Sequence, residues 1–113
     1  MACQPPGLKV VLSPDALRAL DEIWEWNASH YGIDHADRYV AFLLAETNKL
    51  AASFFRGKAV PTLPTLSYIV IRRRRKGHGH LAVYERVGDV INVLQYFHTA
   101  QDWQTKMADE FQA

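Results

Sequence analysis

The apolar residues of this 113-residue chain follow two different spacings, and the change between them lies near residue 56. Between Ser13 and Phe54 they recur every three or four residues, which is the spacing of an amphipathic helix. From Leu66 onward, β-branched and aromatic residues follow one another in short runs, as they do in strands. A helical first half and a strand-rich second half together predict an α+β domain.

Two helices are expected in the first half of the chain. Ser13 can accept the free backbone N–H groups as an N-cap, Pro14 suits the first helical position, and Gly32 is well placed to end the helix. Asp34 is expected to cap a second helix, whose apolar stripe continues to Phe54. With so short a connection, the two helices should form an antiparallel hairpin.

Four strands are expected to share one sheet. They are Leu8–Leu12, Leu66–Arg73, His80–Arg86 and Val90–Phe97. Turn signals at "GHG" and "GD" join the last three into an antiparallel meander, and the first strand should pair with the same sheet. The third strand alternates, with Leu81 and Val83 on one face and His80, Ala82 and Tyr84 on the other. The last strand is apolar on both faces, which predicts a central position.

The remaining segments carry weaker signals. "FRGKAVPTLPT" (55–65) contains Gly57, Pro61 and Pro64, and we predict a loop there. A short final helix or tail is expected around Trp103, Met107 and Phe111. We expect a single domain over residues 1–113, with a flexible N-terminus (1–7) and a C-terminal tail (104–113).

Composition indicates a soluble, cytoplasmic protein that works without a cofactor or metal. Apolar residues make up 49% of the chain, which is enough for a core without disulfides. Cys3 is the single cysteine, and "MACQPPGLKVVL" lacks the pattern of a signal peptide. No apolar run reaches membrane-spanning length. Glycine-rich phosphate loops, nucleophile elbows and paired zinc cysteines are missing, and His78 with His80 is a weak metal signal in a turn that we expect to be exposed.

The formal net charge of +1 hides an uneven distribution of charge. From Ser13 to Ser53 there are three basic and seven acidic residues, whereas from Arg56 to Arg86 there are eight basic and one acidic. The run from Arg72 to Lys76 is either the solvated end of a hairpin or a surface that contacts phosphates or an acidic protein. Because side chains alternate along a strand, at most half of its arginines can enter one groove.

Pairs of neighbouring aromatic residues suggest a surface for a partner. Trp24 and Trp26 cannot both face one core, and the same holds for Phe54 and Phe55. Exposed aromatic residues suit the docking of an amphipathic partner helix, although isolated ones are ordinary surface scatter. The partner-binding candidates are therefore Trp24, Trp26, Phe54, Phe55, Arg72, Arg74 and Trp103.

Three stretches of the chain resemble the RelE/ParE superfamily of toxins from type II toxin–antitoxin modules. "VVLSPDALRALDEIWEW" is similar to the opening strand and helix of these toxins, and "HADRYVAFL" to their second helix. "HLAVYERVGDVINVLQYFHTAQDW" matches their closing strands at His80, Tyr84, Ile91, Val93, Leu94, His98 and Asp102. The resemblance spans Leu8 to Trp103, and it departs from the family pattern in "FFRGKAVPTLPTLSY".

The resemblance implies a bacterial toxin held silent by a cognate, ParD-like antitoxin, and it leaves two activities open. RelE-like members are ribosome-dependent mRNA endonucleases, whereas ParE-like members, known from plasmid stabilisation, inhibit DNA gyrase without cutting RNA. RelE-like nucleases usually carry an arginine three positions before the tyrosine that matches Tyr84, and here that position is Leu81. The comparison favours the ParE-like activity, exerted by protein contact through the open face of the sheet and the C-terminal tail. A relative that only binds its partner and regulates transcription is a third possibility.

An endonuclease would need convergent side chains that can move protons and stabilise a pentavalent phosphate. Its candidates here are Arg72, Arg73, Arg74, Arg75, His80, Tyr84 and His98. For Tyr84 we expect packing rather than chemistry. For His98, directly after the last strand, a structural hydrogen bond, for example to Asp102, competes with general acid–base catalysis.

Overall fold

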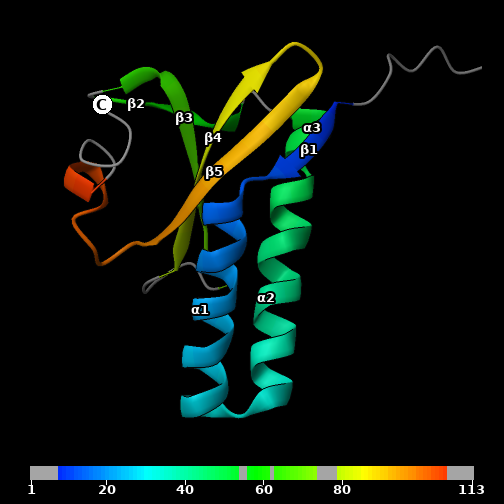
Figure 1. Cartoon of the computed structure of the whole chain (residues 1–113), viewed down its shortest axis with the longest axis vertical. Helices are drawn as coiled ribbons and strands as arrows, with labels where there is room; N and C mark the ends of the chain where they lie inside the picture. Colours follow the sequence, from blue (N-terminus) through cyan, green and yellow to red (C-terminus); the bar gives the residue numbers. More distant parts are fainter. Residues whose placement is uncertain (1–7, 54–55, 62, 74–78, 107–113) are drawn as a thin grey trace, which may run out of the picture.

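The computed structural model describes residues 8–53, 56–61, 63–73 and 79–106, and within these ranges the chain has the predicted α+β character (Figure 1). The first half consists of β1 (Lys9–Leu12), α1 (Pro14–Tyr31), α2 (Ile33–Asn48) and the short α3 (Leu50–Ser53). The second half consists of β2 (Lys58–Val60), β3 (Leu63–Ile71), β4 (His80–Val87) and β5 (Val90–His98). None of the described helices is both long and apolar enough to cross a membrane.

The five strands form one mixed sheet in the order β1-β5-β4-β3-β2. β1 runs parallel to β5, and the other neighbours are antiparallel, which confirms the predicted meander and the pairing of the first strand with the sheet. The loop predicted for residues 55–65 is wrong, because β2 and the beginning of β3 lie there. Proline is tolerated near the edge of a sheet, and the register of this edge hairpin shifts between Ala59 and Val60.

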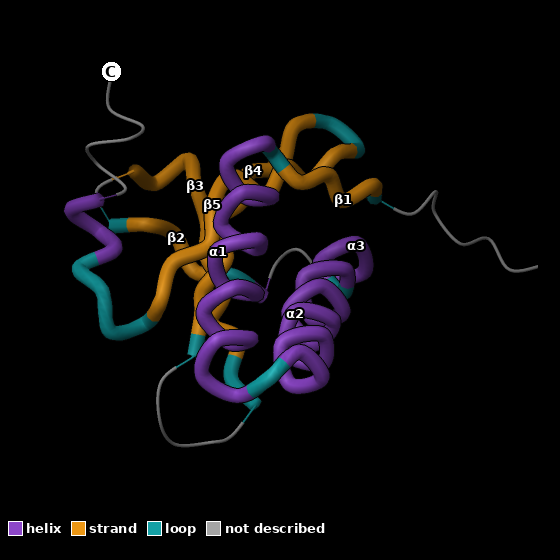
Figure 2. Tube along the Cα trace, turned by 60° about the horizontal axis from the view of Figure 1, so that its bottom comes forward, coloured by secondary structure: helices purple, strands orange, loops and turns teal. Residues whose placement is uncertain are grey.

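The helix hairpin packs on one face of the sheet, and its far end projects past the sheet (Figures 1 and 2). Gly32 ends α1 as predicted and joins it to α2 with a φ of 94°, a conformation that glycine adopts without steric cost. The predicted Asp34 cap is wrong, because α2 begins at Ile33 without a side-chain cap and Asp34 lies in its first turn. Between the helices, Trp24 Nε1 donates a 2.8 Å hydrogen bond to Asp37 Oδ1.

The sheet is apolar on both faces, as the pattern of its last strand predicts. The face under the helices is buried with Ala16, Leu20, Leu43, Leu50, Ile69, Ile71, Ala82, Tyr84, Ile91, Val93 and Tyr96. On this face the Thr47 hydroxyl of α2 bonds to the Tyr96 hydroxyl at 2.7 Å. The opposite face, here called the open face, carries the buried residues Val60, Leu66, Leu81, Val83 and Phe97, against which Leu63, Tyr68, Leu94 and Trp103 pack. The predicted alternation along β4 is confirmed, since Leu81 and Val83 share the open face while Ala82 and Tyr84 lie under the helices.

A β-bulge at Leu94 shifts the alternation of β5, so that it changes which face of the sheet the following side chains occupy. Val83 pairs with Gln95 and Tyr84 pairs with Val93, so that Leu94 is the extra residue. The Ser13 hydroxyl donates to the Leu94 carbonyl at 2.8 Å and accepts from the Ala16 amide at 3.0 Å, while the Ser13 amide donates to the Val93 carbonyl at 2.9 Å. The residue that caps α1 therefore also holds the bulge of β5.

Substitution of Ser13 separates these two roles. Ser13→Ala removes both bonds and should lower the free energy of unfolding by about 1 to 3 kcal/mol. Ser13→Asp keeps a good cap but brings a carboxylate to the Leu94 carbonyl, so it should still cost about 1 kcal/mol or more. Urea unfolding of both variants measures the effect. An Asp variant as stable as the wild type would show that the serine acts only as a helix cap.

Candidate functional site

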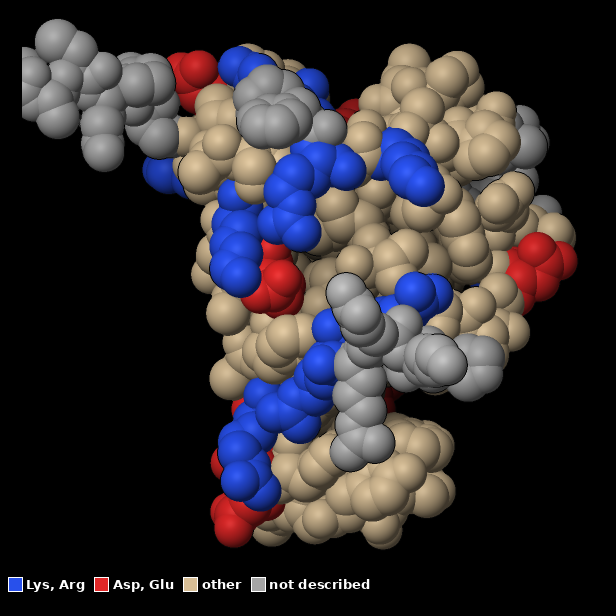
Figure 3. Space-filling view, turned by 180° about the vertical axis from the view of Figure 1, so that it is seen from behind, with Lys and Arg blue, Asp and Glu red and all other residues tan. Residues whose placement is uncertain are grey.

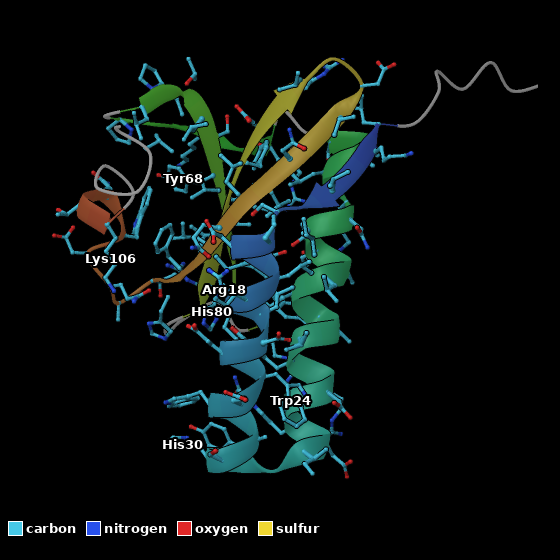
Figure 4. The ribbon with its side chains drawn as sticks, in the orientation of Figure 1. Arg18, Trp24, His30, Tyr68, His80 and Lys106 are labelled. Atoms are coloured by element: carbon cyan, nitrogen blue, oxygen red, sulfur yellow. The ribbon has the colours of Figure 1, made fainter. Side chains whose placement is uncertain are left out.

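A cleft of about 1100 Å³ lies beside the part of β5 that follows the bulge. β1 pairs with Val90–Val93 of β5, and the cleft continues along the strand from Gln95 to His98. α1 forms one wall, and Gln101 and Lys106 line the other. Figure 4 labels three residues of its lining: Arg18 on α1, His80 on β4 and Lys106 beyond β5. Among the described residues, the lining consists of Asp15, Arg18, Ala19, Glu22, Ile23, Trp26, Asn27, Tyr31, His35, Tyr39, Arg73, Gly79, His80, Gln95, Tyr96, Phe97, His98, Gln101 and Lys106.

Two histidines from paired strands meet in this cleft. His80 and His98 are opposite each other in the β4–β5 register, and their ring centroids are 5.1 Å apart in an edge-to-face arrangement. The Tyr39 hydroxyl of α2 bonds to His80 Nδ1 at 2.6 Å, which joins the helix hairpin to the sheet. The expectation of an exposed His80 is wrong, because the ring is half-buried between α2 and β5. Its place in the alternation with Ala82 and Tyr84 already indicated the helix face.

Burial controls the charge of the groups at the floor of the cleft. Desolvation, helped by the neighbouring His98, lowers the pKa of His80 to about 4, so the ring is neutral near pH 7. Burial also raises the pKa of Tyr39, and the nearby positive charge of Arg73 opposes this shift. The hydrogen bond between the two side chains therefore joins two uncharged groups at neutral pH.

The positive charge of the cleft comes from its rim. The Arg73 guanidinium carbon lies 5.9 Å from the centre of the Tyr39 ring and 5.6 Å from that of Phe42, within cation–π range. Arg18 is paired with Asp15 at 2.8 Å. Within the described ranges, Arg73 and Lys106 belong to no salt bridge, and these two cations remain available to an anionic ligand. Among the same residues, no three His, Cys, Asp or Glu side chains are grouped as metal ligands.

A row of rings runs from the tip of the hairpin into the cleft. Trp26 stacks on His30 with centroids 4.0 Å apart, and Tyr31 lies edge-on to Trp26 at 5.8 Å. His35 continues the row at 4.8 Å from Tyr31 and 6.4 Å from Tyr39, the residue that bonds to His80. Sequence reasoning selected Trp26 but missed the others. The spacing of His35 and Tyr39, four residues apart on α2, was a signal for part of this row, whereas the junction between Tyr31 and His35 crosses the break at Gly32.

The structure brings together only some of the residues selected from the sequence. Arg73, His80 and His98 line the cleft, whereas Tyr84 lies four positions beyond His80, about 13 Å along the strand. Tyr84 is buried in the core, and its hydroxyl occupies the space that a Cβ on Gly57 would need. The packing role expected for Tyr84 is therefore confirmed. Arg72 is exposed and absent from the lining of the cleft.

The remaining candidate residues either lie elsewhere on the described surface, make structural hydrogen bonds, or fall outside the described residues. His98 Nδ1 accepts a hydrogen bond from the Ala100 amide, and the Gln101 side chain accepts from the His98 amide. Trp26 is 54% exposed and Trp24 is half-buried, which confirms that they do not share one core. Trp103 is half-buried, with its ring 4.7 Å from that of Tyr68 on the open face. The candidates outside the described residues are Phe54, Phe55, Arg74 and Arg75, together with Lys76, His78, Met107 and Phe111 from the predicted turn and tail.

Basic side chains gather on one face of the molecule. Seen from behind, Lys and Arg side chains form a broken band, with acidic residues beside it (Figure 3).

Comparison with known proteins places this fold and sequence in one family. The family model described as "ParE toxin of type II toxin-antitoxin system, parDE" matches residues 10–103. The solved structure titled "Chromosomal ParDE TA system from P. aeruginosa" superposes with a TM-score of 0.67 at 16% identity, covering 79% of this chain and 92% of that one. Comparison with curated protein sequences finds no match.

A helix hairpin on a five-stranded mixed sheet, together with these matches, defines a small α+β toxin of the toxin–antitoxin class. Within that class, the chain belongs to the ParE toxin family of type II systems.

The charge state of His80 can be tested through the pH dependence of stability. Its pKa is about 4 in the folded protein and 6.5 ordinarily, so the unfolded chain takes up the proton first as the pH falls. The contribution of His80 to the free energy of unfolding, fully present above about pH 6.5, should therefore be lost as the pH falls towards 4. Between about pH 7.5 and about pH 4.5, the wild type should lose roughly 2 to 3 kcal/mol more than His80→Gln. Urea unfolding at both pH values measures this difference, and parallel losses would mean that His80 titrates normally.

Proposed function

We propose that this ParE-family chain is a toxin that inhibits DNA gyrase by direct contact and is neutralised by an antitoxin that covers the open face of its sheet. The single observation that supports this most is the second apolar face. Helices cover one side of the sheet, while the other side carries its own apolar cluster, packed in the described ranges against Trp103. The core members of this cluster are already buried, so the surface that a macromolecular partner could cover consists of the exposed Val70 and the partly buried Leu63, Tyr68 and Leu94.

The open face suits the apolar side of an amphipathic helix. Val70 is 44% exposed and lies on the same side of β3 as Leu66 and Tyr68, beside the buried Leu81. Leu63 and Leu94 extend the apolar strip across neighbouring strands and are only partly buried. Docking of a partner helix would bury these groups, and the removal of apolar surface from water would drive association. The relative from P. aeruginosa is a ParDE system, and an antitoxin partner for this chain is proposed by analogy.

Contact rather than RNA cleavage is favoured by the arrangement of the nuclease candidates. Leu81, at the position where RelE-like nucleases carry an arginine, is buried in the apolar cluster of the open face. Tyr84 is committed to the core on the other face. His80 is neutral near pH 7 and hydrogen-bonded to Tyr39, and with its pKa of about 4 it is a weak base. Of the described candidates, Arg73, His80 and His98 share the cleft, whereas Tyr84 and the position of Leu81 contribute nothing to it.

Expression and enzyme assays test the proposed function together. Induction of the chain alone should arrest bacterial growth, and co-expression of the small protein encoded beside it should restore growth. The purified chain should inhibit supercoiling by gyrase, and ribosome-bound mRNA should stay intact. The preformed complex with the neighbouring protein is the matched control and should leave gyrase active. Harmless expression of the folded chain, or mRNA cleavage with unaffected gyrase, would contradict the proposal.

A further inference from the structure

The lining of the cleft beside β5 differs in chemistry from the open face. Eight of its nineteen residues carry rings, namely Trp26, Tyr31, His35, Tyr39, His80, Tyr96, Phe97 and His98. Among the described residues of the lining, three more carry amides, three carry cations and two carry carboxylates, whereas only Ala19 and Ile23 are aliphatic. A groove for an amphipathic helix is usually lined by aliphatic side chains. Flat rings, amides and cations instead suit a planar, polar and negatively charged ligand.

We infer that this cleft binds a phosphorylated nucleoside, with its base against the ring row and its phosphate at Arg73 and Lys106. The His35 and Tyr39 rings are nearly parallel, at an interplanar angle of 9°, and continue towards the exposed Tyr31. Trp26 of α1 lies at the outer end of the same row, with its ring 5.8 Å from that of Tyr31. Every base has a flat π-face, and stacking on such rings is tolerant of base identity.

The charges of the cleft agree with this orientation. Arg73 lies over the Tyr39 ring at the inner end of the ring row, so a base stacked on the exposed outer rings would direct its phosphate along the row towards this guanidinium. Lys106 reaches the cleft from the far side of β5, and neither cation has a carboxylate partner in the part of the chain that the structure describes. Asp15 is neutralised by Arg18. Glu22 lines the α1 wall, where a carboxylate can accept a hydrogen bond from the exocyclic amino group of a base.

Binding of such a ligand requires neither gyrase nor the antitoxin, because the cleft is formed by the isolated chain. The shared chemistry is a base linked to a phosphate, and it has two possible sources: a free nucleotide or a nucleotide of a single strand. A rigid duplex is not the expected ligand, because its bases are stacked and paired within the helix. A cleft that carries a row of exposed rings can instead bind an unpaired base by stacking.

Fluorescence anisotropy with labelled single-stranded DNA and RNA of roughly ten nucleotides tests binding by the full chain. Arg73→Gln and Trp26→Ala should each weaken binding roughly five-fold or more. Arg72→Gln is the matched control, because it removes the same charge from the neighbouring residue, which is absent from the lining of the cleft. It should change affinity less than about two-fold. All three residues are exposed, and thermal unfolding of each variant establishes that it is folded.

Competition identifies the source of the ligand and excludes simple charge attraction. Displacement of the label by AMP or ATP supports a free nucleotide, and displacement by unlabelled single strands alone supports nucleic acid. Polyglutamate should displace the label poorly. Absence of binding, displacement by polyglutamate as strong as by an unlabelled strand, or equal losses from Arg72→Gln and Arg73→Gln would each overturn the inference.

Discussion

The bulge at Leu94 is the constraint on which the two surfaces of this toxin depend. A regular β5 would send Val93 and Tyr96 to opposite faces, because side chains alternate along a strand. The extra residue returns Tyr96 to the helix face, where it meets Thr47, and brings His98 opposite His80. Ser13 holds this bulge through the Leu94 carbonyl while it caps α1. One side chain thus couples the start of the hairpin to the geometry of the cleft.

The same bulge supplies the open face with the apolar side chains of Leu94 and Phe97. The sheet is therefore apolar on both sides, and the helix hairpin can cover only one of them. This asymmetry separates two kinds of recognition: an aliphatic face that suits a helical protein partner, and a cleft with rings and cations that suits a smaller anionic ligand. The two surfaces meet at Phe97, which belongs to the apolar cluster of the open face and also lines the cleft.

Most of the fold follows from local signals in the sequence, whereas the site depends on register. Ser13 and Gly32 delimit the first helix, and alternation in β4 assigns its faces, because caps and periodicity are properties of neighbouring residues. The sequence did not predict the β2 strand, because prolines in this segment indicate a loop. An edge hairpin nevertheless tolerates them. The cleft could not be derived, because its histidine pair requires the exact β4–β5 register and the bulge. The partnership of Tyr39 with His80 joins residues 41 positions apart, which no local pattern encodes.

The most direct test of the account is methyl NMR of the free toxin and of its complex with the antitoxin encoded beside it. Each face carries its own reporters: Leu66, Leu81 and Val83 on the open face, and Leu43, Leu50 and Ile91 under the helices. The account predicts large shifts of the open-face methyl resonances and nearly unchanged resonances under the hairpin. Shifts confined to the helix-covered methyl groups, with the open-face resonances unmoved, would contradict it.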